Sequence, residues 1–185
     1  MHTWRNSTRA YGIVAQVFHW LVAALVFIQI SIGLYVDDLP ISMARLRWMS
    51  WHKSVGITIL ALVLLRLAWR LVERPPPLPE HMPTFERIAA RLTHWALYGL
   101  LILTPLAGWL TASAMGLSVN WFGWVLIPDL ISKNPELGEV LEYVHWILVR
   151  VLAALFSIHI LAALRHGLRR DGVLTRMVPF MGDRR

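Results

Sequence analysis

The chain contains no cysteine among its 185 residues. This absence excludes a disulfide framework, an iron–sulfur cluster held by thiolates and a haem attached through thioether bonds. Charged residues are also scarce, because Asp, Glu, Lys and Arg together make up only 16% of the chain. A soluble domain of this length usually carries more charge, so the composition argues against a soluble protein.

Apolar residues are abundant instead. They make up 57% of the chain, the mean hydropathy is +0.54, and there are ten tryptophans. Indole rings favour the interfaces of a bilayer, so this composition predicts a membrane protein. The first twelve residues, MHTWRNSTRAYG, are basic and polar. The apolar run after them is too long for the core of a signal peptide, so we expect no cleaved leader.

Four apolar segments are long enough to cross the hydrocarbon core of a bilayer, which takes roughly 20 residues of helix. Backbone groups in lipid must satisfy one another, so these segments are expected to be helices. The proline-rich sequence ERPPPLPEHMP separates the second from the third, because proline cannot continue a helix. We expect one domain over residues 1–185, an all-α integral membrane four-helix bundle with helices over about 13–35, 44–71, 88–115 and 138–165.

The uneven distribution of arginine orients the chain. The net charge is +7, and the arginines gather in the N-terminal tail, around the proline-rich connection and at the C-terminal end. Most acids lie near the other two connections. The positive-inside rule then predicts a multi-pass protein of the bacterial inner membrane with both termini in the cytoplasm. Because topology explains the positive charge, no nucleic-acid partner is expected.

Four histidines lie inside the expected spans at two depths. His52 and His145 each come early in a helix that runs inward, so both are expected near the outer side. His19 comes early in a helix that runs outward, which places it near the cytoplasmic side. His159 follows His145 by fourteen residues, a rise of about 21 Å and close to four full turns, so these two share one helix face. The sequence therefore predicts an outer pair, His52 with His145, and an inner pair, His19 with His159.

These histidine pairs are candidates for haem ligands. Ionisable residues inside a membrane are costly and usually mark function, and two imidazoles from facing helices can ligate a haem iron axially. Two pairs predict two haems between the helices, one above the other, at a separation that suits electron transfer across the bilayer. The alternative is that the histidines only form hydrogen bonds between helices. Zinc is a weaker alternative, because it usually collects four ligands at one depth.

The inner side holds a third candidate ligand, His94, at the start of the third helix. A haem with two histidine ligands leaves one of the three unused, so the partner of His159 is open between His19 and His94. We prefer His19. We expect His94 to support the coordination shell or to face the propionates or a quinone.

Four further residues are candidates for contacts with the haems. Arg66 follows His52 by fourteen residues, so it is expected at the depth of the inner haem, where it either pairs with propionates or reaches for the interface. Arg70 lies one turn on and either assists it or simply extends to the interface, which we favour for Arg70. Lys53 either binds outer propionates, steers a small anion or is an ordinary interfacial lysine. Gly56 would let its helix approach a macrocycle or another helix.

Several segments together resemble the prokaryotic cytochrome b561 family: FHWLVAALVF, WHKSVGITILALVLLRLAWRL, RPPPLP, THWALYGLLILTPLAGW, NWFGWVLIP and the helix that carries His145 and His159. The resemblance covers nearly the whole chain, and the ordered set is specific although no single piece is. It implies a four-helix membrane bundle with two b haems, whose ligands by motif are His19, His52, His145 and His159. Members include a superoxide oxidase, which takes electrons from periplasmic superoxide and reduces ubiquinone, and the cytochrome b subunits of nickel–iron hydrogenases.

The expected function is therefore that of a di-haem b-type cytochrome. It would carry single electrons between a periplasmic donor, superoxide if the resemblance extends to activity, and the quinone pool, with ubiquinone as acceptor. One alternative is an electron-transfer subunit that docks a membrane hydrogenase or dehydrogenase. Another is a haem-free membrane protein that uses its histidines structurally or for transport. Besides lipid, the expected partners are a quinone and either superoxide or a periplasmic redox protein.

Overall fold

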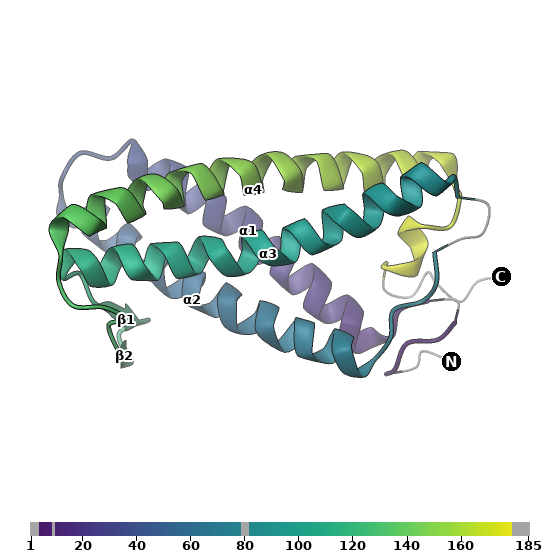
Figure 1. The fold of residues 1–185 in the computed structure, drawn as a ribbon, viewed down its shortest axis with the longest axis horizontal. Coiled ribbons are helices and arrows are strands. Elements are labelled where there is room, and N and C mark those ends of the chain that lie inside the picture. Colours follow the sequence, from purple (N-terminus) through teal and green to yellow (C-terminus); the bar gives the residue numbers. More distant parts are fainter. Residues whose placement is uncertain (1–3, 9, 79–81, 179–185) are drawn as a thin grey trace.

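Four long helices form the molecule (Figure 1). The computed structural model describes residues 4–8, 10–78 and 82–178. Each helix is long and apolar enough to cross a membrane, which confirms the predicted four-helix membrane bundle. The helices are α1 (Ile13–Asp37), α2 (Met43–Val72), α3 (Thr84–Met115) and α4 (Pro135–Arg169).

Two helices, α2 and α4, begin at polar capping residues that precede the apolar segments. The Ser42 hydroxyl accepts a hydrogen bond from the backbone N–H of Arg45 at 3.3 Å. Asn134 Oδ1 accepts one from the backbone N–H of Leu137 at 3.2 Å. These side chains satisfy backbone donors that a helix start leaves unpaired, which is why both helices start before the predicted range.

A short β-hairpin in the connection between α3 and α4 was not expected from the sequence. Strand β1 (Val119–Trp121) pairs antiparallel with β2 (Val125–Ile127). Of the three residues between them, the first two, Phe122 and Gly123, have positive φ angles of 49° and 81°. Two successive positive φ angles are typical of a tight hairpin turn.

The hairpin is attached to α2 by hydrogen bonds, among them one that the Ser54 hydroxyl donates to the backbone carbonyl oxygen of Asn120 at 3.3 Å. Ser54 Oγ accepts from the backbone N–H of Phe122 at 3.0 Å, and Trp121 Nε1 donates to Thr58 Oγ1 at 3.0 Å. We call this end of the bundle the hairpin end. The connection between α3 and α4 therefore covers one end of the bundle.

The opposite end, which we call the terminal end, is closed by the described parts of both chain termini (Figure 1). The backbone N–H of Tyr11 donates to the carbonyl oxygen of Arg176 at 3.3 Å, and Trp20 Nε1 donates to that of Met177 at 2.7 Å. The Arg176 side chain donates to the carbonyl oxygen of Pro77 at 2.6 Å. The two terminal segments and the proline-rich connection thus meet on one side of the expected membrane.

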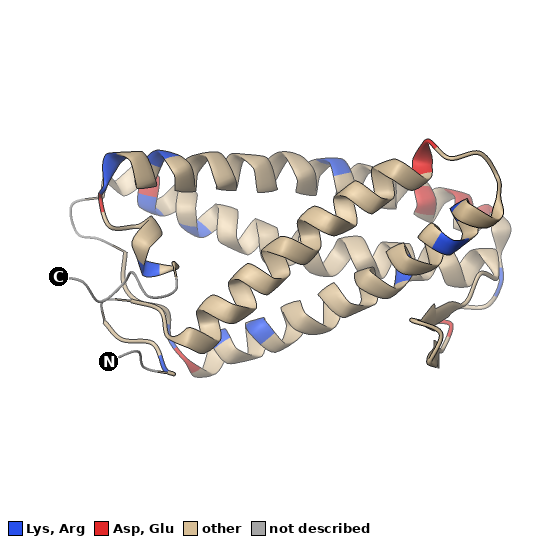
Figure 2. Ribbon diagram, turned by 180° about the vertical axis from the view of Figure 1, so that it is seen from behind, with Lys and Arg blue, Asp and Glu red and all other residues tan. Residues whose placement is uncertain are grey.

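Charged residues gather towards the two ends of the bundle, with more of the acids at the hairpin end (Figure 2). Between the ends lies an apolar core in which Val63 and Val22 have exposed fractions of only 0% and 2%. Along their helices, the members of this core lie between the level of the outer histidines and that of the inner ones: Val22, Val26, Val55, Ile59, Val63, Leu97, Tyr98, Leu101 and Leu152. Packed side chains, most of them apolar, therefore separate the two levels.

Candidate functional site

Two of the predicted histidines, His52 on α2 and His145 on α4, face each other towards the hairpin end. Their ring centroids lie 6.3 Å apart and their planes are nearly perpendicular, at 89°. Two imidazoles that bind opposite sides of one metal ion, each at a metal–nitrogen distance of about 2 Å, have ring centroids roughly 6 Å apart. This pair, which we call the outer site, therefore suits axial ligation of one iron.

The two rings of the outer site differ in their hydrogen bonds. His145 Nδ1 lies 2.9 Å from the backbone carbonyl oxygen of Thr104 on α3. A carbonyl oxygen only accepts, so Nδ1 is the donor, and the neutral ring keeps the Nε2 lone pair for a metal. His52 Nδ1 is buried and has no hydrogen-bond partner in the described part of the chain. A buried polar atom of this kind is expected where a ligand or water completes the site.

Two glycines that the sequence analysis missed leave room for these rings. A Cβ atom on Gly33 of α1 would lie 3.1 Å from Cε1 of His52, and one on Gly108 of α3 would lie 3.0 Å from Cε1 of His145. Each ring therefore lies directly against the backbone of a neighbouring helix. Gly56, a predicted site residue, faces another helix: its Cβ would lie 3.2 Å from the Gln29 side chain of α1.

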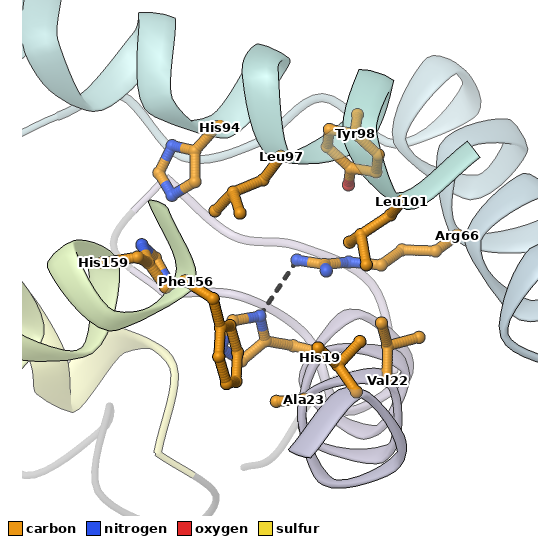
Figure 3. Close-up of a pocket in the computed structure, with 11 residues that line it drawn as sticks. His19, Val22, Ala23, Arg66, His94, Leu97, Tyr98, Leu101, Phe156 and His159 are labelled. Carbon is orange, nitrogen blue, oxygen red and sulfur yellow. Dashed lines mark hydrogen bonds between the residues drawn. The ribbon is translucent and has the colours of Figure 1, made fainter. Parts of the chain in front are cut away.

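Three histidines and one arginine surround a hollow at the other level, which we call the inner site (Figure 3). The hollow encloses about 480 Å³ of space between the side chains, part of it open to the outside. Each helix contributes one of the four polar side chains: His19, Arg66, His94 and His159. The rest of the lining is mostly apolar and consists of Val22, Ala23, Val26, Leu97, Tyr98, Leu101 and Phe156.

Ring distances distinguish the two possible partners of His159. The ring centroids of His19 and His159 are 6.2 Å apart, close to the 6.3 Å of the outer pair. Those of His94 and His159 are 5.5 Å apart. The outer pair serves as a reference within the same molecule, so the spacing favours His19 as the partner of His159.

Arg66 reaches into the inner site and contacts His19. Its Nη2 donates to Nδ1 of His19 at 3.0 Å (Figure 3), and its guanidinium carbon lies 5.3 Å from the centre of the Tyr98 ring. Because arginine only donates, His19 accepts on Nδ1, which leaves the proton on Nε2. Ligation through Nε2 therefore needs Arg66 to turn away. A carboxylate such as a propionate would attract the guanidinium and release His19.

Arg70 lies one turn beyond Arg66, at the terminal end. Its guanidinium carbon is 5.4 Å from the ring centre of Trp95 and 5.6 Å from that of Tyr98. It lines a second hollow of about 330 Å³, which shares Arg66 and Tyr98 with the first. Tyr11 also lines this hollow, and burial raises the pKa of its hydroxyl. The second hollow is thus rich in hydrogen-bond donors.

Lys53 joins α2 to the start of the hairpin connection. Its Nζ donates to the backbone carbonyl oxygens of Leu117 at 3.0 Å and Ser118 at 3.3 Å. The ammonium group therefore has a structural contact here. Its roles toward propionates or a small anion stay predictions.

Comparison with known proteins identifies the family of this bundle. Residues 10–180 match the family model described as prokaryotic cytochrome b561. The chain belongs to this family. It is 31% identical over 182 residues to Cytochrome b561 homolog 2 of Escherichia coli (strain K12), with 94% of this chain and 93% of that protein covered. It is 32% identical over 174 residues to Probable superoxide oxidase CybB of Yersinia pestis, with 92% and 97% covered.

Family membership confirms the predicted resemblance and gives the chain a general role. It is a multi-pass b-type cytochrome of the bacterial inner membrane that takes part in electron transfer. Both sites fit the haem that a b-type cytochrome binds. The outer site has facing imidazoles 6.3 Å apart and a buried ring nitrogen that lacks a partner among the described residues. The inner site has facing imidazoles beside a hollow of about 480 Å³.

Proposed function

We propose that this cytochrome holds two b haems and carries single electrons between a periplasmic donor and the membrane quinone pool. One observation carries the proposal: two histidine pairs with nearly equal ring spacing, 6.3 and 6.2 Å, lie at two levels of one bundle. Helix α4 contributes one residue to each pair, His145 and His159, about 21 Å apart along the helix. This separation, bridged by packed side chains, suits transfer of an electron across most of a bilayer.

Four histidines hold the haems in this proposal. His52 and His145 bind the outer haem through Nε2, and His19 and His159 bind the inner one. A haem bound in this way supplies a one-electron couple, ferric to ferrous iron. The Thr104 carbonyl orients the ring of His145, and the apolar core excludes water from the space between the two levels.

The basic residues around the sites stabilise charge. Arg66 and Arg70 pair with the propionates of the inner haem, because guanidinium groups bind carboxylates strongly and in a fixed geometry. His94 supports the same haem from α3 without ligating it. Lys53, at the hairpin end, contributes positive charge that either meets the outer propionates or attracts a small anion.

Superoxide is the donor that we propose, and ubiquinone the acceptor. The similarity to a protein named probable superoxide oxidase supports this choice. Two superoxide anions lose one electron each and become dioxygen, and one quinone takes up the two electrons and two protons to become a quinol. The excess of arginine at the terminal end supports an orientation with the hairpin end in the periplasm and both termini in the cytoplasm.

The purified protein tests the proposal in two steps. A reduced-minus-oxidised spectrum should show a b-type α-band, and haem extraction should give two haems per chain. Superoxide should then drive ubiquinone reduction that stops when superoxide dismutase is added and that is lost in the His145→Ala variant. A protein without the α-band would refute haem binding. Haem-containing protein that is inert alone, but that co-purifies stoichiometrically with a periplasmic redox enzyme, would favour the role of an electron-transfer subunit.

A further inference from the structure

The two halves of the bundle repeat one pattern of residues. In α1 and in α3, a histidine is followed after ten residues by a polar residue and after four more by a glycine: His19, Gln29 and Gly33 in α1, and His94, Thr104 and Gly108 in α3. In α2 and in α4, a histidine is followed after fourteen residues by a second basic residue: His52 and Arg66 in α2, and His145 and His159 in α4. The hairpin α1–α2 therefore corresponds to the hairpin α3–α4.

In the second half, the polar residue and the glycine of α3 hold the outer histidine of α4. The carbonyl oxygen of Thr104 lies 2.9 Å from Nδ1 of His145. A Cβ atom on Gly108 would lie 3.2 Å from the same nitrogen. Helix α3 thus supplies both a hydrogen-bond acceptor for Nδ1 and a bare stretch of backbone against which the ring lies.

In the first half, the corresponding residues of α1 meet His52 of α2. Gln29 Nε2 donates to the backbone carbonyl oxygen of His52 at 2.9 Å. A Cβ atom on Gly33 would lie 3.1 Å from Cε1 and 3.6 Å from Nδ1 of the His52 ring. Residues four apart share a helix face, so the Nδ1 edge of His52 lies against the face of α1 that carries Gln29.

By analogy with His145, the repeat predicts a hydrogen bond from Nδ1 of His52 to an acceptor on α1, and no such direct bond is made between the described residues of the two helices. His52 Nδ1 and Gln29 Oε1 are both buried, and neither has a partner within the described ranges. One is the ring nitrogen that must donate if Nε2 is to bind iron, and the other is an acceptor with free capacity. Both belong to the contact between α1 and α2, and buried polar atoms normally find partners.

We propose that Gln29 is the positioning residue of His52. The Gln29 carboxamide contacts His52 at two points. Its Nε2 donates to the backbone carbonyl oxygen of His52, and its Oε1 accepts from Nδ1–H of the His52 ring, directly or through one water. A single buried water with two to four polar neighbours commonly completes such a contact. The inference rests on the proposal that His52 ligates the outer haem. It assigns the group that keeps Nε2 of His52 free for the iron.

The expected effect follows from the chemistry of a ligated imidazole. An acceptor on Nδ1–H makes the ring a stronger base, which stabilises ferric iron and lowers the reduction potential. Gln29→Met keeps the length of the side chain but removes the acceptor, so the outer haem should show a higher potential. Its binding should weaken by about 10- to 100-fold, as for other residues that orient metal ligands. Gln29→Glu keeps an acceptor oxygen but adds a negative charge, so it should retain the outer haem and shift its potential in the opposite direction, below that of the wild type.

A control on the same helix is Ser31→Ala. The Ser31 side chain is exposed, and its hydroxyl donates to the backbone carbonyl oxygen of Phe27 at 2.9 Å within α1. Ser31 is two residues from both Gln29 and Gly33, so it lies on the other side of α1. Redox titration followed by electron paramagnetic resonance should resolve the two haems, and the signal missing in His145→Ala identifies the outer one. We expect Gln29→Met to change the g-values and potential of the outer haem alone, and Ser31→Ala to change neither.

Two results would overturn the inference. In the first, Gln29→Met matches Ser31→Ala in the potential and g-values of the outer haem. In the second, Gln29→Glu raises the potential of the outer haem as Gln29→Met does. If Gln29→Met does not fold, Gln29→Asn replaces it with the same expectation, because its shorter amide cannot reach the ring. A wild-type protein that contains no outer haem would refute the proposed function itself, before any variant is compared.

Discussion

The outer and inner sites are built from corresponding helices but differ in symmetry. The outer pair, His52 and His145, occupies equivalent positions in the two halves, and each ring lies against a glycine of the preceding helix. At the inner site, the equivalent of His159 is Arg66, and His19 stands at the matching ring distance instead. The outer site is thus shaped by close contacts with the rings, and the inner one by a positive charge beside a hollow.

The largest effects should come from removing ligands, because each site depends on its own pair. His52→Ala should lose the outer haem and His159→Ala the inner one, so that each variant keeps one haem per chain. Haem extraction and the low-temperature α-band measure this. His145→Ala should match His52→Ala. Loss of both haems from a folded variant, or of the inner haem from His52→Ala, would contradict two independent pairs.

The next comparison concerns the inner site alone. His19→Ala should abolish the inner haem, whereas His94→Ala should keep it with an altered spectrum, because the spacing of His19 to His159 matches that of the outer pair. Haem content of both variants, purified in parallel, decides between them. The opposite pattern would make His94 the ligand and give His19 the supporting role beside Arg66.

The levels of the two sites could be predicted from the sequence because they depend only on spacing along helices. The fourteen residues between His145 and His159 fix their separation and their common face, whatever the loops do. The partner of His159 could not be fixed, since His19 and His94 lie at one depth. Depth follows from residue number, but the distance between two rings depends on how helices tilt and rotate.

Rotation also explains why the important glycines were missed. A helix that is apolar on all sides carries little information about which face meets its neighbour. Gly108 lies against the His145 ring, while a Cβ atom on Gly99 of the same helix would meet no described atom within 4 Å. The hairpin was missed for a different reason: Phe122 occupies a positive-φ turn position that usually takes Asn, Asp or Gly.

Filling the space beside the outer rings should have an intermediate effect. In Gly108→Ala the new methyl group would lie 3.0 Å from Cε1 of His145, and in Gly33→Ala 3.1 Å from Cε1 of His52. Overpacking of this kind costs roughly 1–3 kcal/mol. We expect a lower unfolding temperature and a changed outer-haem spectrum, with the inner haem intact. Gly99→Ala is the matched control and should change neither the unfolding temperature nor the spectrum, because its Cβ atom would meet no described atom within 4 Å. An equal loss in Gly99→Ala would mean that contact with the histidine rings is not the cause.

The smallest effect should come from neutralising the charge that distinguishes the inner site. A positive charge beside a haem favours the reduced iron, so Arg66→Met should lower the potential of the inner haem and leave the outer one unchanged. At a separation of about 10 Å and an effective dielectric constant of about 20, the interaction is worth roughly 1.5 kcal/mol, or some tens of millivolts for one electron. Redox titration of the two haems measures the shift.

Arg70→Met serves as the comparison for this prediction. Arg70 lies one turn further towards the terminal end, with its guanidinium over Trp95 and Tyr98, so its removal should lower the inner potential by less. The opposite order would place the propionates nearer Arg70 than Arg66. A rise in the inner potential on loss of Arg66 would mean that its contact with His19 Nδ1 governs the ligand more than its charge governs the iron.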